Sequence, residues 1–140
     1  FKVSWEIDEA IKYYYIIKIC LQPIIENAVY HGLKPKGGNG VLMIQGEIYH
    51  NEAIVFTISD NGVGIDHMQL EEISQKLNDS DNQMEDHVGI YNVNQRIKIV
   101  FGKDYGVSIQ SEENLGTTVK IRIPIVKLKI NLLRSLRRAT

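Results

Sequence analysis

The sequence is poor in the features that mark secreted, membrane-spanning and nucleic-acid-binding proteins. Its single cysteine, Cys20, cannot form a disulfide within the chain, which is typical of a reducing compartment. Sixteen basic residues against seventeen acidic ones give no general attraction to nucleic acid or to an anionic membrane. No apolar run approaches the roughly 20 residues of a membrane span, and no signal peptide precedes the first strand pattern. These absences favour a cytoplasmic domain that binds no nucleic acid.

Length and composition fit one compact domain. A chain of 140 residues with 44% hydrophobic content can bury a single core, so no second domain is required. Charge is uneven, because five basic residues lie in the last fourteen positions: Lys127, Lys129, Arg134, Arg137 and Arg138. The chain opens at Phe1 directly in a strand pattern. We expect a domain over residues 1–126, a basic tail over residues 127–140, and a longer protein of which this chain is a fragment.

Hydrophobic periodicity predicts interleaved strands and helices. Alternating apolar residues predict strands over residues 3–7, 41–49, 53–59, 105–110 and 118–124. Helical spacing is found over residues 16–28, 67–77 and 90–100, which places Asn27 on a helix and Pro23 near its first turn. Two strand pairs have short links, which favours antiparallel neighbours. The expected fold is a two-layer α/β sandwich with a mixed, mostly antiparallel sheet and helices on one face.

The helix around Asn27 carries polar residues at spacings that share a face. Residues at i, i+3 and i+4 of an α-helix are neighbours, so Asn27, Tyr30 and His31 would point together and line one pocket. An isolated Asn in an apolar helix is more often a structural polar group with its hydrogen bonds satisfied. His31 is equally well explained as a packed, half-buried side chain.

Three glycine turns follow this helix in order: Asp60-Asn61-Gly62-Val63-Gly64, Gly89-Ile90-Tyr91-Asn92, and Gly116-Thr117-Thr118. Each turn alone could serve chain shape only. Together with Asn27 they can supply what a nucleotide needs. An amide oxygen can ligate Mg²⁺, a carboxylate can accept from an amino group on a base, and glycines allow close backbone approach.

The segment from Leu21 to Gly32, with Asp60-x-Gly62-x-Gly64 and the Gly89 and Gly116 turns, resembles the ATP-binding catalytic domain of bacterial sensor histidine kinases of the LytS/YesM type. That domain belongs to the GHKL superfamily shared with gyrase, heat-shock chaperones and MutL. The resemblance implies that Asn27 ligates Mg²⁺ and that Asp60 accepts from the adenine amino group. Glu26 adjoins Asn27 but lies about 100° round the helix, and it is a second catalytic candidate that could polarise an incoming histidine. The residues it assigns to ATP are Asn27, Tyr30, His31, Asp60, Gly62, Gly64, Ile65, Gly89, Ile90 and Thr117.

Some positions depart from the family pattern. His87 occupies the place of the first glycine in the Gly89 turn, and Tyr30 stands where relatives often carry Lys. Hydrolytic relatives place a water-activating Glu one helical turn before the metal-binding Asn, and Pro23 stands at that position. The polar stretch 78–86 lies where the family keeps a mobile lid over ATP, although an ordinary surface loop would have the same composition.

The resemblance also implies partners. The γ-phosphate would pass to a histidine on a dimerisation domain and then to a response regulator, within a homodimeric, membrane-bound bacterial sensor. The four histidines, His31, His50, His67 and His87, do not lie in a dimerising helix pair, so the acceptor domain is expected outside this chain. Two alternatives stay open: a serine kinase of the anti-sigma-factor type, against which Pro23 counts, and a degenerate nucleotide-binding or interaction module.

Overall fold

A computed structural model of the chain describes residues 2–7, 21–78 and 88–125. Its five strands are β1 (Lys2–Ile7), β2 (Val41–Tyr49), β3 (Ala53–Asp60), β4 (Gly106–Glu112) and β5 (Gly116–Pro124). They form one sheet in the order β1-β2-β3-β5-β4, in which β1 and β2 are parallel and every other pair is antiparallel. The predicted mixed, mostly antiparallel sheet is therefore confirmed. The predicted first turns of the helix at residues 16–20, the lid segment 79–86 and the basic tail lie outside the described residues.

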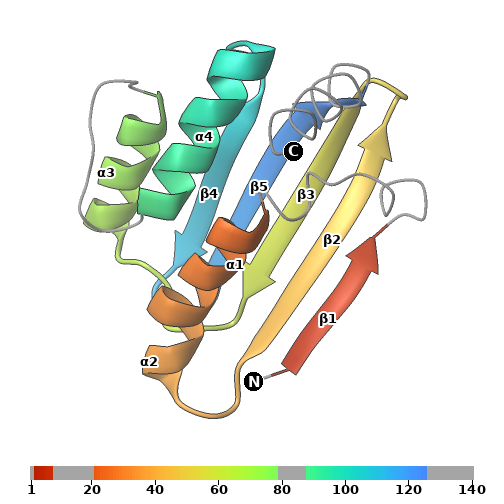
Figure 1. The fold of residues 1–140 in the computed structure, drawn as a ribbon. Coiled ribbons are helices and arrows are strands. Elements are labelled where there is room, and N and C mark those ends of the chain that lie inside the picture. Colours follow the sequence, from red (N-terminus) through yellow and green to blue (C-terminus); the bar gives the residue numbers. More distant parts are fainter. Residues whose placement is uncertain (1, 8–20, 79–87, 126–140) are drawn as a thin grey trace, which may run out of the picture.

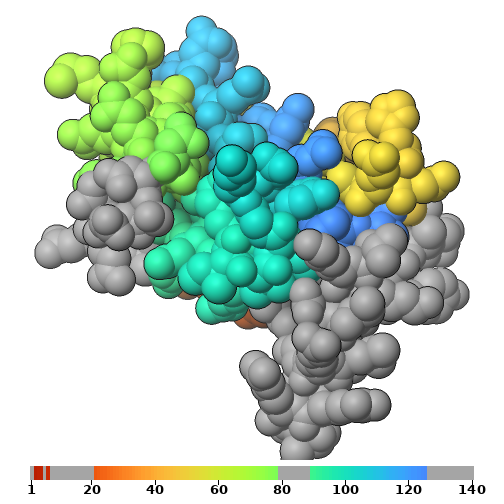
Figure 2. All heavy atoms as spheres, turned by 90° about the horizontal axis from the view of Figure 1, so that it is seen from above, coloured from red at the N-terminus to blue at the C-terminus, as the bar shows by residue number. Residues whose placement is uncertain are grey.

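Helices cover one face of this sheet (Figure 1). They are α1 (Gln22–Asn27), the π-helix η2 (Ala28–Leu33), α2 (Lys34–Lys36), α3 (His67–Asn78) and α4 (Val88–Phe101). Pro23 lies in the first turn of α1, where its missing N–H costs no intrahelical hydrogen bond. Seen from above, α3 and α4 lie next to each other, with the end of the β2–β3 hairpin on the far side of β5 (Figure 2). The two-layer arrangement follows the prediction.

The core lies between the helices and the inner face of the sheet. Strand β3 shows the expected alternation, with Ile54, Phe56 and Ile58 buried while Val55 and Thr57 are partly exposed. The other fully buried large side chains come from all layers: Leu21, Ile24, Leu42, Ile44, Ile73, Ile90, Ile121 and Ile123. The outer face of the sheet is polar by the same alternation, because successive side chains of a strand point to opposite faces.

Tight turns set the register of the two hairpins. Between β2 and β3, His50 and Asn51 have φ of 51° and 55°, and the N–H of Glu52 donates to the carbonyl of Tyr49 at 2.9 Å. Positive φ at both central residues is the type I′ geometry that matches the twist of paired strands. Between β4 and β5, Asn114 takes φ of 67°. The pairing of β5 with β3 places Thr117 opposite Asp60 in the sheet.

Two details of the predicted pattern are wrong. Val3 was expected on the buried face of the first strand, but it is 45% exposed because β1 is an edge strand. Val100 was expected to complete the buried stripe of α4, yet it is 46% exposed and Phe101 is buried instead. The step from Ile97 to Phe101 is four residues, which returns to the same face of a helix as well as a step of three does. In addition, α4 begins at Val88, two residues before the predicted start at Ile90, so Gly89 lies inside its first turn rather than before it.

Candidate functional site

Asp60 is a buried carboxylate at the carboxyl end of β3, with 9% of its surface exposed. Burial raises the pKa of Asp60 above its ordinary value of 3.8. Backbone hydrogen bonds from Gly62 and Thr117 and the positive charge of Lys36 act in the opposite direction, and the N–H of Gly62 lies 2.8 Å from Oδ1. The carboxylate therefore sits in a partly dry environment that strengthens any hydrogen bond it makes.

Glycines surround Asp60 because its neighbours approach too closely for a side chain. A Cβ on Gly32 would lie 2.7 Å from Oδ1 of Asp60. A Cβ on Gly62 would overlap the carbonyl of Gly32, and one on Gly116 would overlap the carbonyl of Asp60. Gly64 also needs its φ of +70°. These glycines let the backbone pack closely around the carboxylate, where a larger residue would clash.

One small hollow brings most of the predicted site residues together. Its lining residues come from the end of α1, from η2, from the end of β3 and the turn after it, and from β5. They are Asn27, Ala28, His31, Gly32, Asp60, Gly64, Ile65, Thr117 and Val119. The hollow measures about 10 Å³, roughly the space of one water molecule. A purine could enter only if these neighbours moved apart. Six of the ten residues assigned to ATP from the sequence share this hollow, while Gly62 supports it from behind by packing on Gly32.

Tyr30 does not reach the hollow, contrary to the expected shared face with Asn27 and His31. It is 60% exposed, and the ammonium of Lys34 lies 4.5 Å from the centre of its ring. The cause is η2, in which the N–H of Lys34 donates to the carbonyl of Val29 in the i→i+5 pattern. Each residue then turns the helix by less than the roughly 100° of an α-helix, so a residue three positions after Asn27 falls farther from its face. The same change brings Gly32 onto that face.

Three other predicted residues lie outside the hollow. Glu26 is exposed, and its Oε1 accepts from the side-chain amide of Gln22 at 3.2 Å. Ile90 is fully buried in the core. Gly89 packs against α1, because a Cβ there would lie 3.3 Å from the carbonyl oxygen of Pro23. In this structure the side chains of these residues do not contribute to the cavity around Asp60.

Ser111 connects several segments around the hollow through hydrogen bonds, although the sequence gave no indication of this role. Its Oγ accepts from the N–H of Ile65 at 2.9 Å and donates to the carbonyl of Gly116 at 2.8 Å. The hydroxyl of Thr117 lies 2.8 Å from the same oxygen. Because Ser111 has one proton and gives it to Gly116, Thr117 must be the donor in that pair. The arrangement ties three parts of the hollow to β4 and leaves Thr117 Oγ1 to act as an acceptor.

Lys36 is a second residue whose role near Asp60 the sequence analysis did not predict. Its ammonium donates to the carbonyl of Asn61, and its charge lowers the pKa of Asp60. The side chain of Asn61 in turn accepts from the N–H of Val41 at 2.7 Å, which joins the turn after β3 to the start of β2. A lysine in a short exposed helix looks like any surface residue in the sequence. Its role depends on a contact twenty-five positions away.

The side chains around the hollow fit a magnesium ion held mainly by its ligand. Within the described residues, no group of three or more His, Cys, Asp or Glu side chains could hold a metal ion alone. Asn27 lines the hollow with an amide that can offer an oxygen. Mg²⁺ is commonly bound through few protein oxygens, with phosphates and waters completing its shell.

The chain matches a known family over most of its length. The profile of the family described as histidine kinase-, DNA gyrase B-, and HSP90-like ATPase matches residues 16–127. The chain belongs to this ATPase family, as the resemblance in its motifs predicted. Within the described residues, no helix is long and apolar enough to cross a membrane.

Two curated relatives are similar over nearly the whole chain. The sensor histidine kinase YesM of Bacillus subtilis is 32% identical over 123 residues, covering 88% of this chain and 19% of YesM. The sensor protein LytS of Bacillus anthracis is 30% identical over 125 residues, covering 89% of this chain and 20% of LytS. The chain thus spans about a fifth of the length of these relatives.

Solved structures share the fold. The histidine kinase domain of the blue-light activated histidine kinase from Erythrobacter litoralis superposes with a TM-score of 0.61 at 17% identity, covering 94% of this chain and 55% of that one. The catalytic domain of the histidine kinase ThkA gives a TM-score of 0.59 at 18% identity, covering 88% of this chain and 79% of that one. The predicted two-layer fold is that of histidine kinase catalytic domains.

Proposed function

We propose that this chain is the ATP-binding catalytic domain of a sensor histidine kinase, which passes the γ-phosphate of ATP to a histidine on a dimerisation domain outside the chain. The observation that carries the proposal is the position of Asp60. It is a buried carboxylate packed among glycines, and it shares one hollow with Asn27, His31 and Thr117. A response regulator would receive the phosphoryl group next, and a homodimeric, membrane-bound sensor would carry the domain on its cytoplasmic side.

Asp60 would recognise the base. Its carboxylate can accept from the amino group of adenine, whereas guanine presents a carbonyl at that position and would leave the acceptor unpaired. An unpaired acceptor in a partly dry site costs about 1–3 kcal/mol, which is enough to select ATP over GTP. Thr117 Oγ1 adds a second acceptor on the same side, since its proton is given to Ser111.

Asn27 would position the phosphates through the metal. It lies at the end of α1, and its side chain lines the hollow that holds Asp60. When bound, Mg²⁺ supplies charge neutralisation for the transferred phosphoryl group. Asn27 would contribute one oxygen to its shell, and His31, exposed at the mouth, lies close enough to the same hollow to contact the nucleotide. Glu26 lies outside the hollow, so any part in catalysis would depend on an incoming acceptor histidine.

The residues favour transfer to an imidazole over hydrolysis. Pro23 has no group that could activate water, and Glu26 is bound to Gln22 on the exposed side of α1. An acceptor imidazole is itself a nucleophile, so the domain needs to position ATP and needs no general base. A serine kinase of the anti-sigma-factor type would need a base to activate the serine hydroxyl. Pro23 cannot supply that base, and among the residues that line the hollow only His31 and Asp60 could accept a proton. Pro23 therefore counts against this alternative.

Calorimetric titration with ATP in the presence and absence of Mg²⁺ tests the nucleotide site. We expect Asn27→Ala to retain the fold, because alanine suits a helix, and to lose most of the increase in affinity that Mg²⁺ gives the parent. Asp60→Asn should weaken ATP binding by about tenfold or more, and it should reduce the ratio of the affinity for ATP to the affinity for GTP. Equal affinity of the parent for ATP and GTP would contradict the role of Asp60.

Radiolabelled ATP tests the transfer step. The chain alone should bind ATP without rapid hydrolysis and without labelling itself. Adding the histidine-bearing helix pair of the full-length protein should give a phosphate label that is stable to base and labile to acid. Rapid hydrolysis, or a stable label on Ser or Thr of this chain, would instead support a hydrolytic ATPase or a serine kinase.

A further inference from the structure

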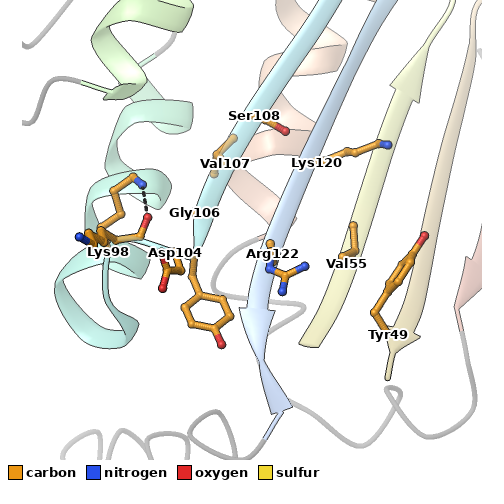
Figure 3. A pocket seen from close by; sticks show the side chains of 11 residues that line it. Tyr49, Val55, Lys98, Asp104, Gly106, Val107, Ser108, Lys120 and Arg122 are labelled. Carbon is orange, nitrogen blue, oxygen red and sulfur yellow. Dashed lines mark hydrogen bonds between the residues drawn. The ribbon is translucent and has the colours of Figure 1, made fainter. Parts of the chain in front are cut away.

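A second hollow lies at the opposite end of the sheet from Asp60 (Figure 3). It measures about 390 Å³ and runs from the last turn of α4, past the start of β4, to the outward faces of β5, β3 and β2. Its charged lining residues are Lys98, Lys103, Asp104, Lys120 and Arg122. We call this hollow the basic groove, because four of these five side chains are cations.

The cations of the basic groove have no acidic neighbours in the sheet. Lys120 and Arg122 are two residues apart on β5, so they point from the same face. Lys120 pairs with Thr57 and Ser108 on the flanking strands, and Arg122 pairs with Val55 and Gly106. Within the described residues, the single ion pair joins His67 to Glu71 on α3, so none of the four cations is neutralised there. With Asp104 as the one acidic residue of the lining, the groove keeps an excess of positive charge, which favours binding of an anion.

Contacts at the α4 end hold two of these cations in place. The ring of Tyr105 packs edge-on against the buried ring of Phe101, with centroids 6.5 Å apart. Arg122 then lies over Tyr105, with Cζ 5.7 Å from the ring centre. On the other side the ammonium of Lys98 donates to the carbonyl of Lys103 at 3.1 Å, as the dashed line in Figure 3 marks. Side chains held before binding lose less entropy when a ligand arrives.

We propose that the basic groove binds an acidic peptide segment of a partner protein, with carboxylates on alternate residues facing Lys120 and Arg122. An extended chain repeats its side-chain direction every second residue, roughly 7 Å along its length. This is also the spacing of two positions two residues apart on β5. A segment with Asp or Glu at every second residue would therefore match both cations, while Lys98 and Lys103 would attract carboxylates farther along the groove.

The shape and chemistry of the groove favour a peptide over other polyanions. A membrane surface is flat and could not follow cations that line a hollow. A single nucleic-acid strand binds mainly through many phosphate contacts and stacking on aromatic faces. In the basic groove the ring of Tyr105 is already in contact with Phe101 and Arg122, and Tyr49 is the other aromatic residue of the lining, so the groove offers little aromatic surface for stacked bases.

Binding in the basic groove would not compete with a nucleotide. Asp60 is the last residue of β3 and Thr117 the second of β5, whereas Val55 and Arg122 lie near the other ends of the same strands. The inference is thus independent of the function proposed above. A partner could be held at one end of the sheet while the other end binds ATP.

Fluorescence anisotropy with a short labelled peptide, in which Asp and Glu alternate with Ser, tests the proposal. The same peptide with Asn and Gln in place of Asp and Glu is the neutral control. We expect the acidic peptide to bind, with affinity that falls as ionic strength rises. The double change Lys120→Glu with Arg122→Glu should weaken binding by about tenfold or more, and the milder Lys120→Gln with Arg122→Gln should weaken it in the same direction.

Matched control variants distinguish an effect of the groove residues from an effect of the net charge of the protein. Lys2→Glu with Lys76→Glu alters net charge equally on β1 and α3, away from the groove, and should change affinity by less than about twofold. Thermal melts and ATP titration of both double variants should match the parent. Equal losses in the two charge-reversed proteins, or tighter binding of oligothymidylate or phosphatidylserine vesicles than of the acidic peptide, would overturn the proposal.

Discussion

The two ends of the sheet are built on opposite principles. At the carboxyl end of β3, backbone packs on backbone through Gly32, Gly62 and Gly116, and a single buried carboxylate supplies the polarity. At the other end, long exposed side chains supply the charge, and Gly102, which directly follows α4, has open space around it. The first design fixes a ligand by shape and hydrogen bonding, while the second attracts one by charge. Substitutions should therefore cost more stability at the first end than at the second.

Glycine replacement gives the largest expected difference between the ends. Gly62→Ala would drive a methyl group into the carbonyl of Gly32, and neither backbone segment can yield without moving Asp60. We expect a loss of about 3 kcal/mol in unfolding free energy, together with loss of ATP binding. Gly102→Ala should cost only about 1 kcal/mol for its φ of +103°. Urea denaturation of both variants measures their unfolding free energies. Similar losses at the two positions would contradict the difference between the two ends of the sheet.

Acidity gives a second test, because burial raises the pKa of Asp60 in the folded protein alone. Between the ordinary value of 3.8 and the higher folded value, the folded state holds more protons than the unfolded state. Stability must then fall as pH rises through this range. Relative to Asp60→Asn, which cannot ionise, the parent should lose stability from about pH 4 upward. Unfolding free energies of both proteins across this range provide the measurement. A parent that gains stability over the variant would contradict the raised pKa.

Two serines on β4 allow the two ends of the sheet to be compared within one strand. Ser111→Ala removes the hydrogen-bond partner of the Ile65 N–H and of the Gly116 carbonyl. We expect the unfolding free energy to fall by about 1–2 kcal/mol and ATP affinity to fall severalfold. Ser108→Ala, on the exposed wall of the basic groove, should change stability by less than about 0.5 kcal/mol. Denaturation and ATP titration of the two variants provide the data. If Ser108→Ala weakened ATP as much as Ser111→Ala, Ser111 would have no special part in positioning the hollow.

Local patterns predicted the fold well, because its strands and helices follow simple periodicities. Alternation in β3 and β5 and the short link that joins β2 to β3 needed no knowledge of the tertiary structure. Asp60 was also recognisable as a site candidate from its turn. The packing role of Gly32 and the contacts of Ser111 were not, since each depends on residues far away in the sequence. The π-helix was missed for another reason: apolar spacing over one turn cannot distinguish i→i+4 from i→i+5 bonding.

Tyr30 tests that helical register with the smallest expected effect. An α-helix would bring Tyr30 to the face of Asn27 and make it a nucleotide contact, whereas η2 turns it outward over Lys34. Tyr30→Ala should therefore change Mg-ATP affinity by less than about twofold and stability by less than about 0.5 kcal/mol, as expected for an exposed side chain. His31→Ala, one residue farther along and lining the hollow, is the matched comparison and should have the larger effect on affinity. Calorimetry on both variants decides the register, because in an α-helical segment Tyr30→Ala would also lose affinity.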